Sequence, residues 1–136
     1  MTTELSIQEE TRQARVPVTV FRLKGDVDGK TYEQLQNLAA EAHRSGARNL
    51  LLDLGGVDYM SSAGLRALNT IFNLLRSEPS ELDDQNMTRG IRDGTYKSAH
   101  LKLLKPSANV LKVLQTSGMD MFLEIYTKES EALAAF

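Results

Sequence analysis

The sequence predicts an α/β fold in which a mixed sheet is backed by helices. Segments with strand-like and helix-like periodicity alternate along most of the chain, which is typical of strands joined by crossover helices. Residues 49–54 form a nearly continuous apolar run, which suits a central strand covered on both faces. With 136 residues, the chain is long enough to bury a core of its own. We therefore expect one domain over residues 1–136.

The remaining strands are predicted from short apolar segments. Residues 16–24 alternate apolar and polar side chains, the period of two that a half-buried strand shows. Pro17 cannot donate a ladder hydrogen bond, so we expect the start of this strand at a margin of the sheet. Residues 99–104 and 122–126 are two further strands. A strand over residues 5–11 is also considered, although charged side chains interrupt its pattern.

Four helices are predicted from apolar residues that recur at helical spacing. The first can be capped by Asp28 or Thr31, and Ser45-Gly46 ends it because glycine readily adopts a left-handed conformation. The second follows two adjacent serines, and the third is opened by Pro106-Ser107. The predicted helical segments are residues 31–44, 62–76, 107–117 and 130–136.

Residues 77–97 differ in character from the rest of the chain. Acidic residues, glycine and proline dominate and apolar anchors are few, so the composition predicts a flexible insertion instead of packed structure. Long surface loops cost little closure entropy, and a tolerated insertion is therefore the simplest interpretation. The alternative is that the segment modifies the choice of partner through Arg89, Arg92, Tyr96 and Lys97.

The composition excludes several classes of function. There is no cysteine, which removes disulfides, thiolate catalysis and cysteine-ligated metals. A formal charge of −2 argues against binding to nucleic acid or to anionic membranes. The amino terminus has no secretory signal and no apolar run is long enough to span a bilayer, so we expect a cytoplasmic protein without membrane insertion. His43 and His100 lack ligand spacing, and no metal is expected.

Two serines at the start of the second helix are the candidate functional residues. The first N–H groups of a helix have no partner within it and carry partial positive charge, so a phosphate on Ser61 or Ser62 would meet donors. The small residues Ala63 and Gly64 would allow another protein to approach closely. A plain helix cap is the ordinary alternative. A nucleophilic Ser62 would need an oriented base, which the two histidines do not offer, so no enzyme is predicted.

Several segments together resemble the STAS domain of the single-domain anti-sigma factor antagonists of bacteria. They are residues 23–28, 50–54, 57–66, 113–120 and 122–126. The resemblance implies a four- or five-stranded mixed sheet packed on one side by helices, about four in number. It also implies a partner that is both a serine kinase with a histidine-kinase-like ATPase fold and an anti-sigma factor. The unphosphorylated form captures this kinase and frees a sigma factor, and a serine phosphatase resets the switch. ATP belongs to the kinase, so no cofactor is expected here.

The resemblance places the phosphoacceptor at Ser62, with Ser61 as the alternative, because Ser61 stands where many relatives carry aspartate. It implies that Asp26 and Asp28 contact the kinase, although turn formation and helix capping would also explain them. The predicted partner-binding residues are Asp26, Asp28, Ser61, Ser62, Ala63, Gly64 and Arg66. A second interpretation is an unphosphorylated STAS subunit of a stress-signalling complex or a lipid-transport ATPase.

Overall fold

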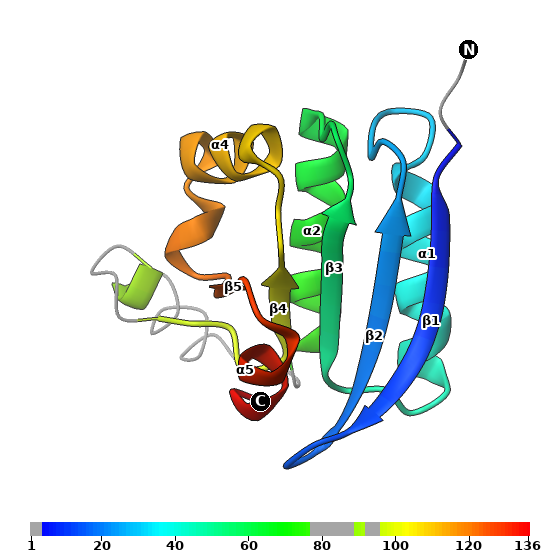
Figure 1. Ribbon diagram of the computed structural model, residues 1–136, viewed down its shortest axis with the longest axis vertical. Coiled ribbons are helices and arrows are strands. Elements are labelled where there is room, and N and C mark those ends of the chain that lie inside the picture. The colour runs from blue at the N-terminus through cyan, green and yellow to red at the C-terminus, as the bar shows by residue number, and fades with distance from the viewer. Residues whose placement is uncertain (1–3, 77–88, 92–95) are drawn as a thin grey trace.

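The computed structural model describes residues 4–76, 89–91 and 96–136. A five-stranded sheet with the order β1-β2-β3-β4-β5 forms its centre (Figure 1). Strands β1 and β2 pair antiparallel, and each later pair of neighbours is parallel. The predicted mixed sheet is therefore confirmed. The strands are β1 (Ser6–Gln13), β2 (Pro17–Lys24), β3 (Leu50–Gly56), β4 (Leu101–Leu104) and β5 (Ile125–Tyr126).

The helices follow the predicted order. They are α1 (Tyr32–Arg44), α2 (Ser62–Leu75), α4 (Ala108–Ser117), the 3-10 helix η1 (Met119–Met121) and α5 (Glu129–Ala134). Local signals explain their ends. Ser107 caps α4 by accepting a hydrogen bond from the N–H of Val110, and Gly118 ends it in the left-handed conformation. Thr31 is the N-cap residue of α1, but its side chain makes no capping hydrogen bond.

The side chains of the central strands alternate between two buried clusters. In β3, Leu50, Leu52 and Leu54 belong to the larger cluster, which includes apolar residues of α1, α2 and α4. Leu51 points to the other face and packs with residues of β2, β4 and α5. The prediction that this strand is covered on both faces is confirmed.

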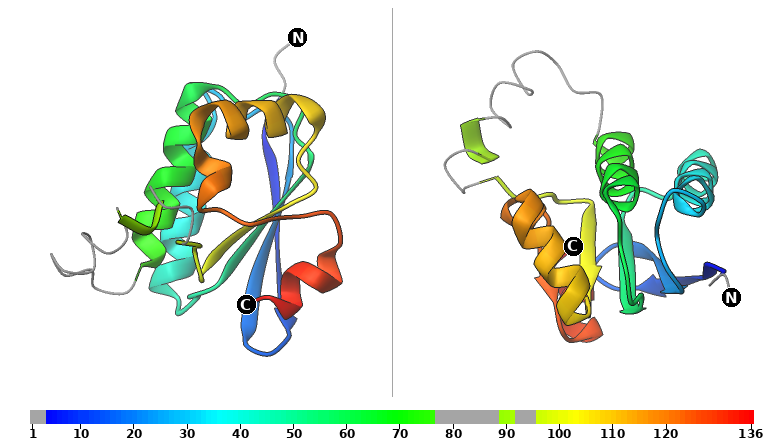
Figure 2. Two further views of the ribbon diagram at one scale, coloured as in Figure 1. Left: turned by 90° about the vertical axis from the view of Figure 1, so that its left-hand side faces the viewer. Right: turned by 90° about the horizontal axis from the view of Figure 1, so that it is seen from above.

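Helix α5 lies on the face of the sheet opposite α1 and α2 (Figure 2). The expectation that helices cover only one side is thus correct for α1 and α2 and wrong for α5. Ala132 is fully buried against Val18, Val20, Leu51 and Leu104. The reason is the apolar stripe that β2 to β4 present on this second face, because exposed sheet surface of this kind is stabilised by any helix that covers it.

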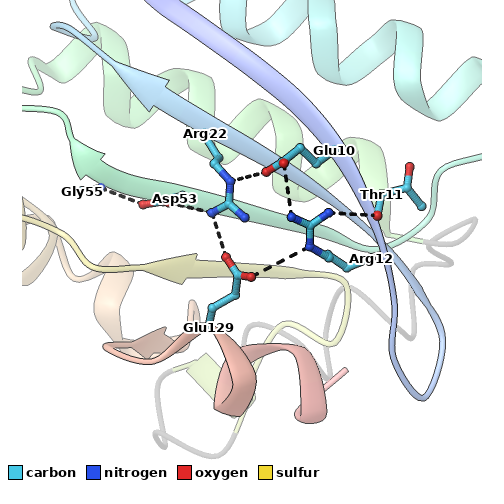
Figure 3. Close-up of polar contacts among 7 residues, drawn as sticks. All are labelled: Glu10, Thr11, Arg12, Arg22, Asp53, Gly55 and Glu129. Carbon is cyan, nitrogen blue, oxygen red and sulfur yellow. Dashed lines mark hydrogen bonds and ion pairs between the residues drawn. The ribbon is translucent and has the colours of Figure 1, made fainter.

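An ion-pair network attaches α5 to the sheet beside this apolar stripe (Figure 3). The guanidinium of Arg22 on β2 bonds Glu129 of α5 at 2.7 Å and Asp53 of β3 at 3.0 Å, and also contacts Glu10 of β1. Arg12 adds contacts to Glu10 at 3.2 Å and Glu129 at 4.0 Å. The hydrogen bond from Arg22 is the main reason that the pKa of Glu10 lies below its usual value.

The network also explains why β1 extends beyond the predicted segment. The structure has a strand over Ser6–Gln13, in which every residue is half-buried or exposed. Its charged residues fit an edge strand because Glu10 and Arg12 are ion-paired and Glu9 reaches solvent. At the other edge, β5 is shorter than the predicted strand over 122–126, because the N–H groups of Phe122 and Leu123 bond back to the carbonyl oxygen of Met119 in η1.

Part of the predicted flexible insertion is packed. Ile91 and Tyr96 contact the larger cluster, and the ring of Tyr96 meets that of Phe72 edge-on with centroids 6.1 Å apart. Lys97 donates a hydrogen bond to the carbonyl oxygen of Met121 at 2.7 Å. The expectation of an unpacked segment is therefore wrong at its carboxyl end. Residues 77–88 and 92–95, which include Arg92, lie outside the described residues.

Candidate functional site

The candidate site lies where two crossover loops meet at the carboxyl ends of β2 and β3. We call it the serine site and define it as residues 25–31, from the loop after β2, and residues 57–66. Val27 forms an isolated parallel bridge with Met60. The N–H of Val27 donates a hydrogen bond to the carbonyl oxygen of Tyr59 at 3.0 Å. The N–H of Ser61 donates one to the carbonyl oxygen of Val27 at 2.9 Å. The loop that carries Asp26 and Asp28 therefore lies against the segment that leads into the two serines.

The two serines have different structural roles. Ser61 is the N-cap of α2, with φ −87° and ψ 178°, and its Oγ accepts a hydrogen bond from the N–H of Ala63 at 3.1 Å. Ser62 is the first residue of α2 and is exposed. In the described part of the chain, no residue makes a hydrogen bond with its Oγ. The capping alternative that the sequence left open thus applies to Ser61.

The two aspartates of the serine site also differ. The carboxylate of Asp28 accepts hydrogen bonds from the N–H of Lys30 at 2.9 Å and from the Thr31 hydroxyl at 3.2 Å. That hydroxyl also reaches the carbonyl oxygen of Asp26 at 2.8 Å. Asp28 therefore shapes the loop, as its turn-forming alternative predicted. Asp26 is half-buried as a residue, and its carboxylate has no such contact among the described residues.

Gly64 is a packing position. It is buried, and a Cβ there would lie 2.6 Å from Cγ of Met60 and 2.8 Å from the carbonyl oxygen of Val27. Only glycine lets α2 begin this close to the loop after β2. The prediction that Gly64 offers backbone to an approaching partner is thus corrected, because its Cα faces the interior. Ala63 is half-buried and Arg66 is exposed.

Tyr59 is a surface residue that the sequence did not single out. Its side chain is 52% exposed although it lies between the buried residues Val57 and Met60. Its carbonyl oxygen is fixed by the N–H of Val27, so a well-placed backbone presents a large aromatic ring to solvent. The sequence shows three large apolar residues here, Val57, Tyr59 and Met60. The spacing of these residues does not tell which side chain is exposed to solvent.

The histidines lie at the other end of the sheet. His100 precedes β4, where its Nδ1 lies 2.9 Å from Oδ1 of Asn49, and its carbonyl oxygen bonds the N–H of Leu50 at the start of β3. His43 lies in the last turn of α1. Ser62 follows the carboxyl end of β3, so neither imidazole is positioned to act on it as a base. Within the described residues, no three acidic or histidine side chains come together as metal ligands would.

Comparison with known proteins assigns the family. A model of the STAS domain matches residues 9–82. Over 115 residues the chain is 44% identical to a Bordetella bronchiseptica protein named as the anti-sigma factor antagonist BtrV, covering 84% of this chain and 82% of that protein. The chain belongs to the STAS domain family.

Solved structures share this fold. An anti-sigma factor antagonist from Mycobacterium paratuberculosis superimposes with a TM-score of 0.73 at 17% identity, covering 97% of this chain and 93% of that one. The anti-sigma factor antagonist SpoIIAA in its unphosphorylated form gives 0.66 at 23% identity, covering 93% and 92%. The Bacillus protein SpoIIAA in its phosphorylated form gives 0.59 at 23% identity, covering 93% and 96%. The five strands found here agree with the sheet that the sequence resemblance implied.

Across residues 4–76, 89–91 and 96–136, no helix combines the length and the apolar composition that crossing a bilayer requires.

Proposed function

We propose that this chain is an anti-sigma factor antagonist that acts as a phospho-regulated binding switch. In its unphosphorylated form it binds an anti-sigma factor that is also a serine kinase with a histidine-kinase-like ATPase fold, and a sigma factor is released. Phosphorylation of Ser62 by that kinase ends the interaction, and a serine phosphatase restores it. The chain performs no catalysis and carries no cofactor, and it works in the cytoplasm.

The observation that carries this proposal is the division of roles between Ser61 and Ser62. The Oγ of Ser61 caps α2 through the N–H of Ala63, whereas Ser62 is exposed and no described residue occupies its hydroxyl. A kinase can therefore modify Ser62 without removing the cap that stabilises the helix. The relative named as an anti-sigma factor antagonist supports the assignment, as does the existence of SpoIIAA in unphosphorylated and phosphorylated forms.

The residues around Ser62 suit a switchable contact. We assign the partner surface to Asp26, Asp28, Tyr59, Ser62 and Arg66, which the two loops and the first turns of α2 bring to one end of the sheet. An exposed tyrosine can supply much of the binding energy, because aromatic side chains dominate interface hot spots. A phosphate on Ser62 would add about two negative charges beside two aspartates. That change is large enough to break a contact between surfaces of complementary charge.

The test combines phosphorylation with binding. The protein is incubated with ATP and each candidate anti-sigma factor kinase of its organism, and the site of any phosphate is mapped by mass spectrometry. Ser61→Ala and Ser62→Ala serve as a matched pair. We expect phosphate on the wild type and on Ser61→Ala, and none on Ser62→Ala. Binding of the kinase is then measured for the unmodified protein, the phosphorylated protein and Ser62→Asp, and we expect only the first to bind tightly.

Other results would replace the proposal. Phosphate on Ser62→Ala but not on Ser61→Ala would move the acceptor to Ser61. If no kinase modifies either serine and Ser62→Asp binds partners as the wild type does, the chain is instead an unmodified STAS subunit of another assembly. A stress-signalling complex and a lipid-transport ATPase are the two assemblies to test.

A further inference from the structure

Helix α2 carries one charged residue, Arg66, and its position relative to Ser62 is distinctive. The sequence of the helix is SAGLRALNTIFNLL, which contains no acidic residue. Arg66 follows Ser62 by four positions, the spacing at which two side chains on a helix are neighbours. Its guanidinium therefore has no carboxylate on its own helix with which to pair.

The pattern of exposure confirms that both side chains share one face. The exposed positions of α2 are residues 62, 66, 69, 70 and 73, and those between them are buried or half-buried. Side chains on a helix lean toward its amino terminus, so Arg66 is directed back over the turn that holds Ser62. Farther along this face the residues are neutral, and Thr70 contacts Gln36 of α1.

The surroundings leave Arg66 available. The charged groups of the serine site and of the first turn of α1 are Asp26, Asp28, Lys30, Glu33 and Asp58. Asp28 is engaged by Lys30 N–H and the Thr31 hydroxyl, and Glu33 by the hydroxyl of Tyr32. Among the described residues, none forms an ion pair with Arg66.

We propose that Arg66 is the internal counter-ion of phosphorylated Ser62, a positioning residue that holds the phosphate along the exposed face of α2. The inference rests on the proposed phosphorylation of Ser62. A guanidinium binds phosphate oxygens with two parallel N–H donors, which fixes orientation as well as charge. The pair draws the phosphate away from the carboxylates of Asp26 and Asp28. It also removes the cationic side chain from the surface that the unmodified protein offers to its partner, so one modification changes two contact groups.

The experiment uses full-length protein with phosphoserine installed at position 62 during translation, so no kinase or partner is needed. The second ionisation of the phosphate is followed by ³¹P NMR in the otherwise wild-type protein and in Arg66→Gln, Arg66→Lys and Arg44→Gln. Arg44 is the matched control, because it is an exposed helical arginine in the last turn of α1, at the other end of the sheet.

We expect the titration midpoint to lie about 0.2 to 0.4 pH unit lower in the wild type and in Arg44→Gln than in Arg66→Gln. Arg66→Lys should keep most of this difference, because the lysine is also a cation. Salt at about 0.5 M should reduce the difference by screening the pair. Equal midpoints in the wild type and Arg66→Gln would overturn the proposal. The proposal would also fail if Arg44→Gln raised the titration midpoint as much as Arg66→Gln does. It would fail as well if the midpoint in Arg66→Lys were as high as in Arg66→Gln. Failure of kinases to modify Ser62 would count against the proposed function and leave this titration unchanged.

Discussion

The N–H of Ser61 donates a hydrogen bond to the carbonyl oxygen of Val27, with 2.9 Å between the two atoms. This bond joins the residue that caps α2 to the residue between Asp26 and Asp28. The start of α2 is therefore tied to the loop after β2, which also carries the acidic residues Asp26 and Asp28.

Replacement by alanine should lower stability at Ser61 and leave it nearly unchanged at Ser62. Ser61→Ala removes the acceptor for the N–H of Ala63, and we expect it to lower the free energy of unfolding by about 1 kcal/mol. Ser62→Ala removes an exposed hydroxyl and should change stability by less than about 0.5 kcal/mol. Urea unfolding followed by circular dichroism measures both. A larger loss for Ser62→Ala than for Ser61→Ala would mean that the capping assignment is wrong.

Gly64→Ala should be strongly destabilising for a substitution that adds one methyl group. The new Cβ would lie 2.8 Å from the carbonyl oxygen of Val27 and 2.6 Å from Met60 Cγ, and separating the loop from α2 should cost about 1–3 kcal/mol. Gly29→Ala is the control, since no atom lies within 4 Å of a Cβ there. Its stability should remain within about 0.5 kcal/mol of wild type. Equal thermal denaturation midpoints for the two variants would contradict the packing role of Gly64.

Tyr59→Ala should weaken binding to the anti-sigma factor kinase without affecting the fold. The side chain is 52% exposed, so its loss uncovers little of the core. Removal of an aromatic anchor should raise the Kd about tenfold or more. Met121→Ala is the matched control, because Met121 is the other large apolar side chain exposed in the described residues, at 41%, and lies in η1. Calorimetric titration should show unchanged affinity for Met121→Ala, and equal losses would place the contact elsewhere.

Arg22→Gln should loosen helix α5. The change leaves Glu10, Asp53 and Glu129 without the guanidinium that they share, and we expect a loss of about 1–2 kcal/mol in stability. Amide hydrogen exchange should rise first in residues 129–136. Arg12→Gln removes a more exposed arginine, with 41% of its side chain accessible, and should have less effect. Unchanged exchange at α5 in Arg22→Gln would show that its apolar contacts suffice.

The ion pair between Lys102 and Glu124 should make stability depend on acid pH. The two charged atoms lie 2.7 Å apart, and Lys102 is only 2% exposed. Its hydrogen bond is the main cause that lowers the pKa of Glu124 below its ordinary value of 4.5. A lowered pKa in the folded state means that the stabilisation is complete above about pH 4.5 and disappears as the pH falls through the folded-state value.

Glu124→Gln provides the measurement. The variant should be less stable than wild type at pH 7, because the buried ammonium of Lys102 loses its charged partner. The difference between the two urea midpoints should then shrink as the pH is lowered from 5 to 3. Glu41→Gln is the control, since Glu41 is exposed on α1 without an ion pair among the described residues. A difference that stays constant over this range would exclude the pair as its source.

Local patterns in the sequence determined much of the fold. The alternation in β2 and the apolar run of β3 predicted two central strands, because side chains in a strand face opposite sides in turn. Ser107 and Gly118 marked the ends of α4, because capping depends on residues within one turn. The serine site could be located in the same way, since a helix start follows from the residues at that start.

Tertiary structure alone decided the features that depend on distant contacts. The place of α5 follows from apolar side chains of β2, β3 and β4, and the length of β1 from pairing with β2 and from Arg22. The same holds at the serine site. Ser61 and Ser62 are the same type of residue. Only the turn of the chain after the Val27 contact makes Ser61 the cap of α2 and leaves Ser62 exposed. Gly64 likewise appeared free in the sequence and is enclosed in the fold, because Val27 and Met60 approach it from outside α2.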